Sequence, residues 1–402
     1  MNSTLDIDVV SEHLAQIVGS GHVTRHGTCL AARPANTEEV SALLKFANAR
    51  RLVVEVSGAG TKRAWGNAVR PSILLETGRM NSVREHTWQD LTCTVEAGCS
   101  WQLMQKTLAR HGQFVALDPL WPDTASIGGI LATNDSGSLR LKYGSLRDLV
   151  IGVTLVLADG TMARSGGKVV KNVAGYDLHK LMIGAYGTLG VITEITFRLH
   201  AIPRHLRTFS FLSPVPEPLG QLLLSLLDCH LNAQAIQLRS TENSFSLDVQ
   251  LAALPEVIEE QANNLYAMAK AVGVEPADSP DEVWSARQSL FEGAPGFVVK
   301  GTMVPTRIAA TAAAIHRLGW YSVTQASGVM IARVPSDQEA GLVTLRCGLE
   351  EDGGSLTILQ ETSENSVDRW GKLPDSIDLM RRIKSQFDPN GILNPGRFLG
   401  GI

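Results

Sequence analysis

The sequence has little of what marks several classes of protein. Its five cysteines are scattered at positions 29, 93, 99, 229 and 347 without a C-x-x-C pair, so iron–sulfur and zinc sites have no local signature. No apolar run approaches the roughly 20 residues of a membrane span. The first residues lack the basic and apolar regions of a signal peptide. We therefore expect ordinary thiols in a cytoplasmic protein that is at most peripheral to the inner membrane.

An excess of basic residues is also missing. The 402 residues carry a formal net charge of -4 at pH 7, whereas a protein that binds nucleic acid usually presents a strong positive field. With 44% hydrophobic and 19% charged residues, the composition is that of an ordinary soluble globular protein. Nucleic acid is therefore excluded as a main partner.

The length predicts two or three domains. Glycine becomes rarer after about residue 205, where alanine and leucine rise, and Ile202-Pro203 ends the strand-like stretch before that change. We predict a first domain over 1–204, a second over 205–370 and a C-terminal segment over 371–402. No internal repeat is visible in the sequence.

Helices and strands alternate in the first domain, which predicts an α+β or α/β unit. Asn36 and Glu39 have the spacing of a helix N-cap, and an apolar stripe of period 3.6 follows them. Ser100 is expected to cap a second helix, with Leu103 among the residues of its inner face. Strands are predicted at residues 52–56, 73–76, 91–96, 149–157 and 191–199.

In the second domain, strand-like segments alternate with apolar helices. Helices are expected at residues 219–227 and 256–271, and strands at 235–238, 245–251, 297–303, 329–334 and 356–360. This order predicts a ferredoxin-like sheet with helices on one face. The C-terminal segment is expected to hold a short helix at 377–386, followed by turns. The whole chain is thus predicted to be an α+β protein.

Two glycine-rich segments indicate a cofactor pocket. Residues 122–137 combine glycines with small hydroxyl and amide side chains, which let a ligand approach the backbone and form hydrogen bonds without bulk. Residues 57–61 directly follow a predicted strand, so that their N–H groups would form a nest for a diphosphate. Arg63 replaces the third glycine of a G-x-G-x-x-G motif, and the loop is no P-loop. Alone this loop would equally well be a plain turn, but together with 122–137 and 187–192 it favours a cofactor site.

Several motifs occur in order along the chain. They are Gly58-x-Gly60-Thr61, Ser126-Ile-Gly-Gly129, Ala132-Thr-Asn134, Lys171-Asn-x-x-Gly-Tyr-Asp177, Gly187-Thr-Leu-Gly-Val-Ile-Thr193 and Phe387-Asp-Pro-x-Gly-Ile-Leu-Asn-Pro-Gly396. Over nearly the whole chain, this set resembles the FAD-linked oxidases of the vanillyl-alcohol-oxidase and p-cresol-methylhydroxylase (PCMH) type. Residues 168–178 are most similar to the smaller FAD-binding subunits, the E subunits, of bacterial glycolate oxidases. The resemblance implies a PCMH-type FAD-binding domain of two subdomains, a ferredoxin-like α/β cap domain, and a C-terminal segment that returns to the FAD domain.

The resemblance also implies a role for each matching residue. The FAD diphosphate would be held by Gly58, Ala59, Gly60 and Thr61, and the ribityl chain and phosphates would run along Ser126, Gly129 and Asn134. The adenine would lie near Val191 and Ile192, and Asn394 would lie on the flavin side. The expected site is completed by Lys62, Gly128, Thr133 and Gly190. No histidine or cysteine stands at an evident position for a covalent flavin bond, so non-covalent FAD is expected. Lys168 and Lys171 would place positive charge near a reduced flavin, with a solvated surface as the alternative.

The substrate side departs from the family pattern. Relatives that oxidise 2-hydroxy acids carry histidine-rich segments that hold a metal ion, whereas residues 325–332 and 353–360 here contain neither histidine nor carboxylate. No metal site is therefore predicted, and His316 is expected to be an ordinary helix residue. Arg287 and Lys300 match positions that bind a substrate carboxylate in catalytic relatives, although a surface arginine in a salt bridge is an equally good interpretation. No other catalytic residue is assigned.

Two functions follow from this contrast. In the first, the chain is the FAD-binding subunit of a glycolate oxidase (glycolate dehydrogenase) complex that converts glycolate to glyoxylate. It would relay electrons, while a sister catalytic flavoprotein subunit oxidises the substrate alongside an iron–sulfur subunit. In the second, the chain is a stand-alone FAD-dependent dehydrogenase of a small D-2-hydroxy acid such as D-lactate. The missing histidines favour the first, and a scaffold without flavin is a third, weaker alternative.

Overall fold

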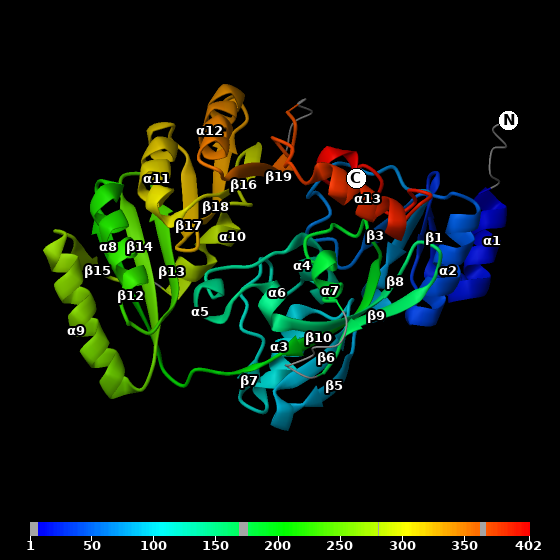
Figure 1. Ribbon diagram of the computed structural model, residues 1–402, viewed down its shortest axis with the longest axis horizontal. Coiled ribbons are helices and arrows are strands. Elements are labelled where there is room, and N and C mark those ends of the chain that lie inside the picture. Colours follow the sequence, from blue (N-terminus) through cyan, green and yellow to red (C-terminus); the bar gives the residue numbers. More distant parts are fainter. Residues whose placement is uncertain (1–6, 169–175, 280, 362–366) are drawn as a thin grey trace. The chain divides into compact units, whose positions relative to one another are not determined.

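The computed structural model describes residues 7–168, 176–279, 281–361 and 367–402, so that Lys171 and most of the motif around it lie outside the described residues. The chain divides into two units, called here the first and the second unit (Figure 1). The first unit contains Met1–Asp135, Ser145–Ala201 and Leu373–Ile402, and the second contains Ser136–Gly144 and Ile202–Lys372. The domain boundaries expected at 204 and 370 stay a prediction.

One half of the first unit is a small sheet with the strand order β1-β2-β4-β3, in which β2, β4 and β3 run parallel and β1 runs antiparallel to β2. Asn36 caps the second helix as predicted: its Oδ1 accepts a hydrogen bond from Glu39 N at 2.8 Å. The predicted apolar stripe of this helix is buried against the sheet. The elements are α1 (Ile7–Val18), β1 (Val23–His26), β2 (Cys29–Ala32), α2 (Thr37–Ala49), β3 (Val54–Ser57) and β4 (Ile73–Glu76).

The other half of the first unit is an antiparallel sheet with the order β5-β6-β10-β8-β9. Four helices share one hydrophobic core with it. A separate pair is formed by β7 (Gln113–Phe114) and β11 (His200–Ala201). The elements of this half are β5 (Val83–Thr87), β6 (Thr92–Glu96), α3 (Trp101–Ala109), α4 (Ile127–Thr133), α6 (Leu146–Leu149), β8 (Val150–Val156), β9 (Met162–Gly166), α7 (His179–Met182) and β10 (Val191–Arg198).

Helix α3 confirms its predicted cap but corrects its predicted inner face. The hydroxyl of Ser100 accepts a hydrogen bond from Leu103 N at 3.2 Å. The inward orientation expected for Leu103 is wrong, because its side chain is 47% exposed. Trp101, Met104 and Leu108 are spaced three and four residues apart and form the buried face, and Leu103 lies off that line.

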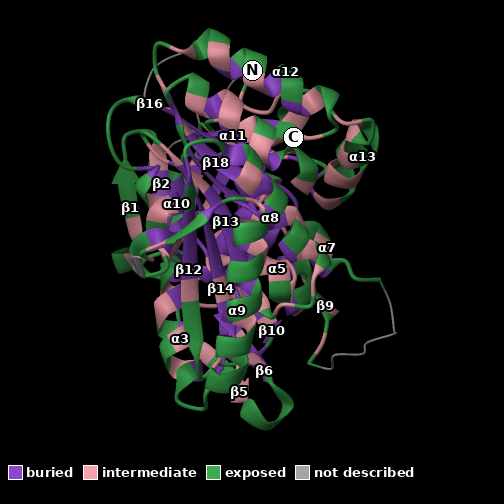
Figure 2. Cartoon of the chain, turned by 90° about the vertical axis from the view of Figure 1, so that its left-hand side faces the viewer, coloured by how far each residue is buried: buried purple, intermediate pink, exposed green. Residues whose placement is uncertain are grey.

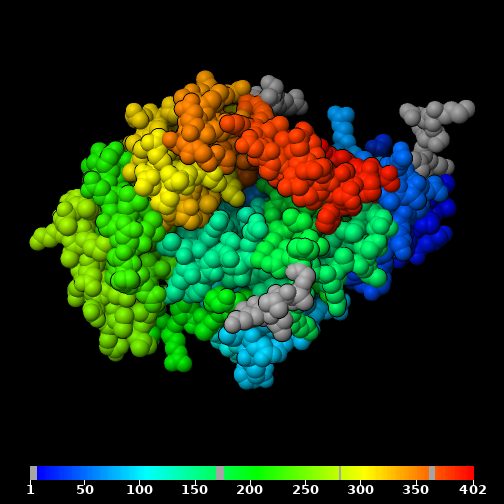
Figure 3. Space-filling view, in the orientation of Figure 1, coloured from blue at the N-terminus to red at the C-terminus, as the bar shows by residue number. Residues whose placement is uncertain are grey.

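The C-terminal residues of the first unit lie against its earlier parts (Figure 3). After α13 (Ile377–Phe387), the chain runs parallel to β3 at the edge of the small sheet. Val54 N donates to Ile392 O at 2.8 Å, and Asn394 N donates to Val54 O at 2.9 Å. The strand that leads into the 57–61 loop is therefore flanked by residues far away in the sequence.

The second unit is built on an antiparallel sheet with the order β15-β12-β14-β13-β17-β18-β16-β19. Its four long helices share a single core with alternate residues of the strands, so that they cover one face. Figure 2 shows buried residues along β13, β14 and β18, and exposed residues on α8 and α9. The elements are α5 (Arg140–Tyr143), β12 (Leu206–Ser213), α8 (Pro216–Asp228), β13 (Ala233–Ser240), β14 (Phe245–Ala252), α9 (Pro255–Ala271), β15 (Glu275–Ala277), α10 (Ala286–Ser289), β16 (Gly296–Thr302), α11 (Ile308–Arg317), β17 (Tyr321–Gln325), β18 (Val329–Pro335), α12 (Glu339–Glu351) and β19 (Ser355–Glu361).

The second unit contains the ferredoxin-like arrangement twice. The first half runs β12-α8-β13-β14-α9-β15 and the second runs β16-α11-β17-β18-α12-β19. Their strand orders, β15-β12-β14-β13 and β19-β16-β18-β17, are equivalent, and the halves join through the antiparallel pair β13–β17. The sequence predicted one such sheet and showed no repeat; the repeat is one of topology.

Candidate functional site

A cavity in the first unit collects residues from separate segments of the chain: the end of β3 and the loop after it, helix α4, the loop before β10 and the start of β10, and the C-terminal segment, together with Thr77 and Ala97. Most of the residues predicted to bind FAD line it, namely Gly58, Gly60, Thr61, Lys62, Ser126, Gly128, Gly129, Thr133, Gly190 and Ile192. The other four, Ala59, Asn134, Val191 and Asn394, are not among the lining residues. Val191 is fully buried and belongs to the hydrophobic core of the small sheet.

The loop after β3 presents backbone donors to the cavity. Gly60 has a φ of +77°, a conformation that glycine adopts without strain. Within the described part of the chain, the N–H groups of Gly60 and Thr61 have no hydrogen-bond acceptor. A Cβ on Gly58 would lie 1.9 Å from the Oγ of Ser126, so that glycine is needed for the loop to approach α4. These features suit an anion that accepts hydrogen bonds from the backbone.

Helix α4 forms a second wall. The Ser126 hydroxyl accepts a hydrogen bond from Ala59 N at 3.3 Å and thereby joins the two walls. A Cβ on Gly129 would meet only that hydroxyl, at 3.1 Å, so the surface of the helix is open there. Gly128 serves packing instead, because a Cβ would lie 2.9 Å from the Cβ of Ala97. The wall is therefore flat and small on the side that faces the cavity.

Asn134 ends α4 in the left-handed conformation, with a φ of +49°. Its Oδ1 is buried and has no hydrogen-bond partner among the described residues. Because an unpaired buried polar atom is costly, this oxygen fits a site that is completed by a bound polar group. The Thr133 hydroxyl, by contrast, bonds back to Gly129 O at 2.8 Å.

Lys62 lines the cavity, but its charge is neutralised. Its Nζ lies 3.2 Å from Oδ2 of Asp135, and the side chains of both residues are buried. The same carboxylate oxygen accepts a hydrogen bond from Leu120 N at 2.8 Å, and the ammonium lies 5.2 Å from the centre of the Trp121 ring. Lys62 thus links the loop to residues on both sides of α4, with Leu120 and Trp121 before the helix and Asp135 after it.

A buried carboxylate below the loop was not predicted from the sequence. Glu55 lies on β3, and its carboxylate accepts hydrogen bonds from Arg63 Nε at 2.9 Å and from Arg63 Nη2 at 2.7 Å. Nη1 of Arg397 lies 3.1 Å from the same carboxylate. Burial raises the pKa of Glu55, but the hydrogen bonds and charges of the two arginines outweigh it and hold the pKa below its ordinary value. Both arginines line the cavity. Arg397 directly follows the Asn-Pro-Gly motif, which was the only available signal for it.

The C-terminal segment fixes the loop before β10. Asn394 accepts a hydrogen bond from Val56 N at 3.2 Å and donates to Tyr186 O at 2.8 Å. Lys384 donates to Thr188 O at 2.7 Å and to Leu393 O at 2.9 Å. Burial lowers the pKa of Lys384, although its ion pair with Asp388 acts in the opposite direction. Asn394 is therefore placed to hold a cavity wall in position.

The two candidate substrate residues lie in the second unit. Arg287, on α10, is buried, and its Nη1 donates to Ser136 O, which also accepts from Gln325 Nε2 at 3.2 Å. Lys300 is half-buried on β16. His316, on α11, packs on the Phe245 ring at 4.8 Å between centres. Arg287 thus has a structural partner.

A buried carboxylate on the second unit's sheet is also bonded to its neighbours. Asp248, which is fully buried, accepts hydrogen bonds from Ser210 Oγ at 2.8 Å, from Gln237 Nε2 at 3.1 Å and from Arg239 Nε at 2.5 Å. No group of three or more His, Cys, Asp or Glu side chains able to hold a metal occurs among the described residues. None of the helices in that part of the chain has the length and apolar character of a membrane span.

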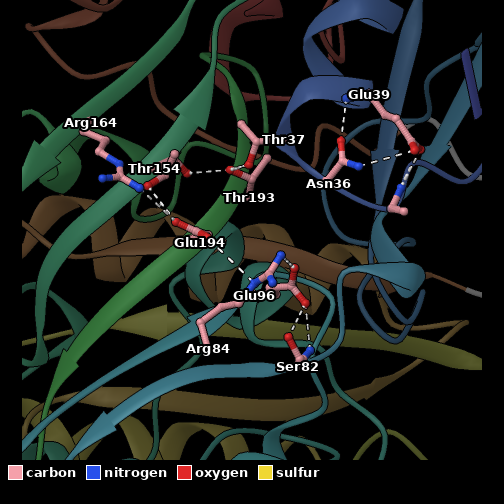
Figure 4. Close-up of polar contacts among 11 residues, drawn as sticks. Asn36, Thr37, Glu39, Ser82, Arg84, Glu96, Thr154, Arg164, Thr193 and Glu194 are labelled. Carbon is pink, nitrogen blue, oxygen red and sulfur yellow. Dashed lines mark hydrogen bonds and ion pairs between the residues drawn. The ribbon is translucent and has the colours of Figure 1, made fainter.

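Another polar group lies on the five-stranded sheet of the first unit (Figure 4). Arg84 pairs with Glu96 at 2.5 Å, and Arg164 lies 3.6 Å from Glu194. Lys168, one of the lysines expected near the flavin, is exposed and forms an ion pair with Glu85. Since the opposite charges are paired and the cations are largely exposed, this group is a solvated sheet face.

Two family models match the chain. One describes an FAD binding domain and matches residues 30–166, and the other describes the C-terminal domain of FAD linked oxidases and matches residues 369–398. Both matched ranges contribute residues to the cavity. The expected cofactor, FAD, is thus confirmed at the level of the family.

Several known proteins are similar in sequence. The chain is 27% identical to glycolate oxidase subunit GlcD of Bacillus subtilis, over 90% of this chain and 87% of that protein. It is 28% identical to a D-lactate dehydrogenase of Archaeoglobus fulgidus, over 91% of this chain and 90% of that protein. A 40% identical match to the mitochondrial D-lactate dehydrogenase (cytochrome) of Arabidopsis thaliana covers 43% of this chain and only 30% of that protein.

Solved structures share the fold. The 4-ethylphenol oxidase from Gulosibacter chungangensis has a TM-score of 0.77 at 16% identity, and the match covers 98% of both chains. p-Cresol methylhydroxylase with substrate bound has a TM-score of 0.76 at 16% identity, over 97% of this chain and 96% of that one. At such identities the likeness concerns the fold alone, and it confirms the predicted α+β fold of PCMH type.

Proposed function

Because the chain belongs to the FAD-linked oxidases with a PCMH-type FAD-binding domain, we propose that it is the FAD-binding subunit of a complex that oxidises a small 2-hydroxy acid, with glycolate as the first candidate. The observation that carries this proposal is the contrast between the cavity of the first unit and the polar sheet face of the second. Among the described residues, the N–H groups of Gly60 and Thr61 in the cavity have no acceptor, whereas in the second unit Asp248 is bonded to Arg239 and Arg287 is bonded to Ser136 O.

The cavity fits FAD through this chain's own residues. We place the diphosphate at the loop of residues 57–62, where N–H groups and a nearby arginine pair favour an anion. The ribityl chain would run along the open surface at Gly129, toward the unpaired Oδ1 of Asn134. When bound, FAD supplies a two-electron acceptor. We propose that it is held without a covalent bond, so that acid precipitation of the protein should release it into solution.

Electron relay by this chain is supported by the hydrogen bond that Arg287, the candidate substrate residue, already makes within the protein. Arg287 is buried and bonded to Ser136 O, so its guanidinium is not presented to a substrate as an open fork. No cluster of metal ligands accompanies it among the described residues. A separate subunit would then remove hydride from the substrate. The proposed partners are a sister catalytic flavoprotein and an iron–sulfur subunit, in a complex of the cytoplasm or the inner membrane surface.

A stand-alone dehydrogenase of a D-2-hydroxy acid such as D-lactate is the second candidate. It is favoured by the similarity to the Archaeoglobus fulgidus D-lactate dehydrogenase, which extends over 91% of this chain. In that case Arg287 and Lys300 would have to contact the substrate carboxylate, and Arg287 would first have to leave Ser136 O.

The two candidates are separated by anaerobic reduction of the purified chain. We expect a yellow protein whose flavin is reduced by dithionite but is not bleached by glycolate or D-lactate. After co-expression with its neighbouring gene products, glycolate should bleach the flavin of the complex. The dithionite step is the control that shows a reducible flavin.

Each other result changes the conclusion. Bleaching of the isolated chain by glycolate would exclude a pure relay role, and bleaching by D-lactate would favour the stand-alone dehydrogenase. A colourless protein that does not take up added FAD would contradict both candidates.

A further inference from the structure

We infer that Arg397 is an additional ligand of the FAD diphosphate and that the buried Glu55 positions it. This inference rests on the proposed placement of the diphosphate at the loop of residues 57–62. It concerns residues to which neither the glycine-rich motifs nor the family resemblance assigned a role.

Arg397 combines burial, charge and a surface on the cavity. Its residue is 6% exposed, and it lines the cavity together with the loop. Its Nη2 donates to Arg63 O at 2.7 Å, so the guanidinium is attached to the loop itself. Its Nη1 bonds to Glu55 at 3.1 Å. A guanidinium carries five N–H groups, and these two contacts leave donors for an anion in the cavity.

The charge balance identifies this pair of arginines rather than Lys62 as the attraction for an anion. Three basic side chains line the cavity, and Lys62 is neutralised by Asp135 at 3.2 Å. Arg63 and Arg397 share one carboxylate, Glu55, so the group has one positive charge in excess. A diphosphate would be the counter-charge.

Of the two arginines, Arg397 is the better ligand. Arg63 donates hydrogen bonds to Glu55 from both Nε and Nη2, and its side chain is 49% exposed. Arg397 gives Glu55 a single nitrogen and has a 7% exposed side chain, so that its charge is less screened by water.

The backbone around Arg397 is fixed before any ligand arrives. Asn67 N donates to Arg397 O at 2.9 Å, and Asn67 Nδ2 donates to Gly396 O at 2.9 Å. Three residues earlier, Asn394 links Val56 N to Tyr186 O. Glu55 then fixes the side chain. A preformed donor loses little freedom on binding, which favours affinity.

The test is FAD affinity of the full-length apoprotein, measured by fluorescence titration at low and high KCl. We expect Arg397→Gln to raise the Kd for FAD about ten- to a hundredfold, the usual effect of losing a charged hydrogen bond. The Kd of the variant should also depend less on KCl than that of the wild type. Arg397→Lys should recover part of the affinity. Arg33→Gln, which removes a surface arginine paired with Glu76 at 2.8 Å, is the matched control and should leave the Kd unchanged.

Arg397→Gln leaves Glu55 with one partner and can impair folding, so a double variant keeps the test decisive. Glu55→Gln/Arg397→Gln removes the buried charge together with its partner and should fold while showing the same weakened binding. The role of Arg397 would be overturned if both variants had a Kd within about threefold of the wild-type Kd at low and at high KCl, since losing a charged hydrogen bond weakens binding by more than threefold. Failure of the wild type to bind FAD would instead overturn the proposed function.

Discussion

At position 60 the backbone is left-handed and the residue faces the cavity, and these two properties can be separated by experiment. We expect Gly60→Leu to lose FAD during gel filtration, because the side chain would fill the space in which the diphosphate approaches the backbone. Gly27 has a similar φ of +61° but lies in open space outside the cavity lining. Gly27→Leu therefore carries the same backbone strain and should keep its flavin. The measurement is the ratio of flavin to protein, and equal ratios would contradict the placement of the diphosphate.

Glu55 makes a prediction about acid stability. Its pKa in the folded protein lies below the ordinary 4.5, because the two arginines outweigh the effect of burial. The carboxylate therefore stabilises the folded state above pH 4.5, and this contribution is lost as the pH falls through the lowered pKa. Glu55→Gln removes this contribution at every pH.

The free energy of unfolding of Glu55→Gln should consequently fall less steeply with acid than that of the wild type. Urea unfolding at about pH 6 and about pH 4 measures the two slopes. An equal loss of unfolding free energy in both proteins would contradict the lowered pKa of Glu55.

Residue roles differ in how far they could be predicted from the sequence. The glycine-rich segments can be identified from a local pattern, because several small residues fall within a few positions of one another. The Glu55–Arg397 pair does not, since its members are 342 residues apart and each looks like a surface residue in its own neighbourhood. Lys62 was predicted to bind FAD, and the chain places it on the lining but in an ion pair with Asp135. The roles assigned to the lining residues stay predictions.

At the scale of elements, helix α13 acts as a support for a wall that it does not itself form. Lys384→Met would remove the hydrogen bonds to Thr188 O and Leu393 O and leave the buried Asp388 without its cation. We expect faster hydrogen exchange in peptides that cover residues 186–190 and 390–397, with little change elsewhere. Arg381→Met, on an exposed part of the same helix, is the control. Unchanged exchange in both peptides would exclude the supporting role.

Three apolar strands of the second unit were predicted well, whereas β17, whose buried residues are largely polar, was missed. β14, β16 and β18 follow the expected ranges to within one or two residues. β17 was not predicted, because Ser322, Thr324 and Gln325 are polar and yet buried. Ser322 N, for example, is satisfied by Ser240 Oγ at 2.7 Å on the neighbouring strand. Such partners come from pairing across the sheet, which no local pattern contains.

At the scale of the whole molecule, the cavity belongs to one unit, and this predicts an uneven effect of the cofactor. FAD at a hundred times its Kd should stabilise the unit that binds it by about 2.7 kcal/mol. We expect added FAD to slow hydrogen exchange throughout the first unit and to leave the second unit's core, around Phe211 and Leu247, unchanged. Equal protection of both units would mean that the cofactor also binds the second.

The sequence predicted one ferredoxin-like arrangement in the second unit, whereas the structure contains two that share a topology. Each half satisfies the same pattern of two helices on a four-stranded sheet, but the core residues that fill them differ. Packing requires volume and apolarity rather than particular side chains, so two halves can keep one topology without visible repetition.

The placement of Arg397 also has a consequence for the order of synthesis. A ribosome releases Glu55 and the glycine loop hundreds of residues before it releases the arginine that completes their charge balance. Until then, Glu55 has only Arg63 of its two cations, and the edge of β3 lacks the neighbouring chain at Leu393. If Arg397 is a ligand of the diphosphate as proposed, this part of the FAD site can form only after the segment around residue 397 has been synthesised.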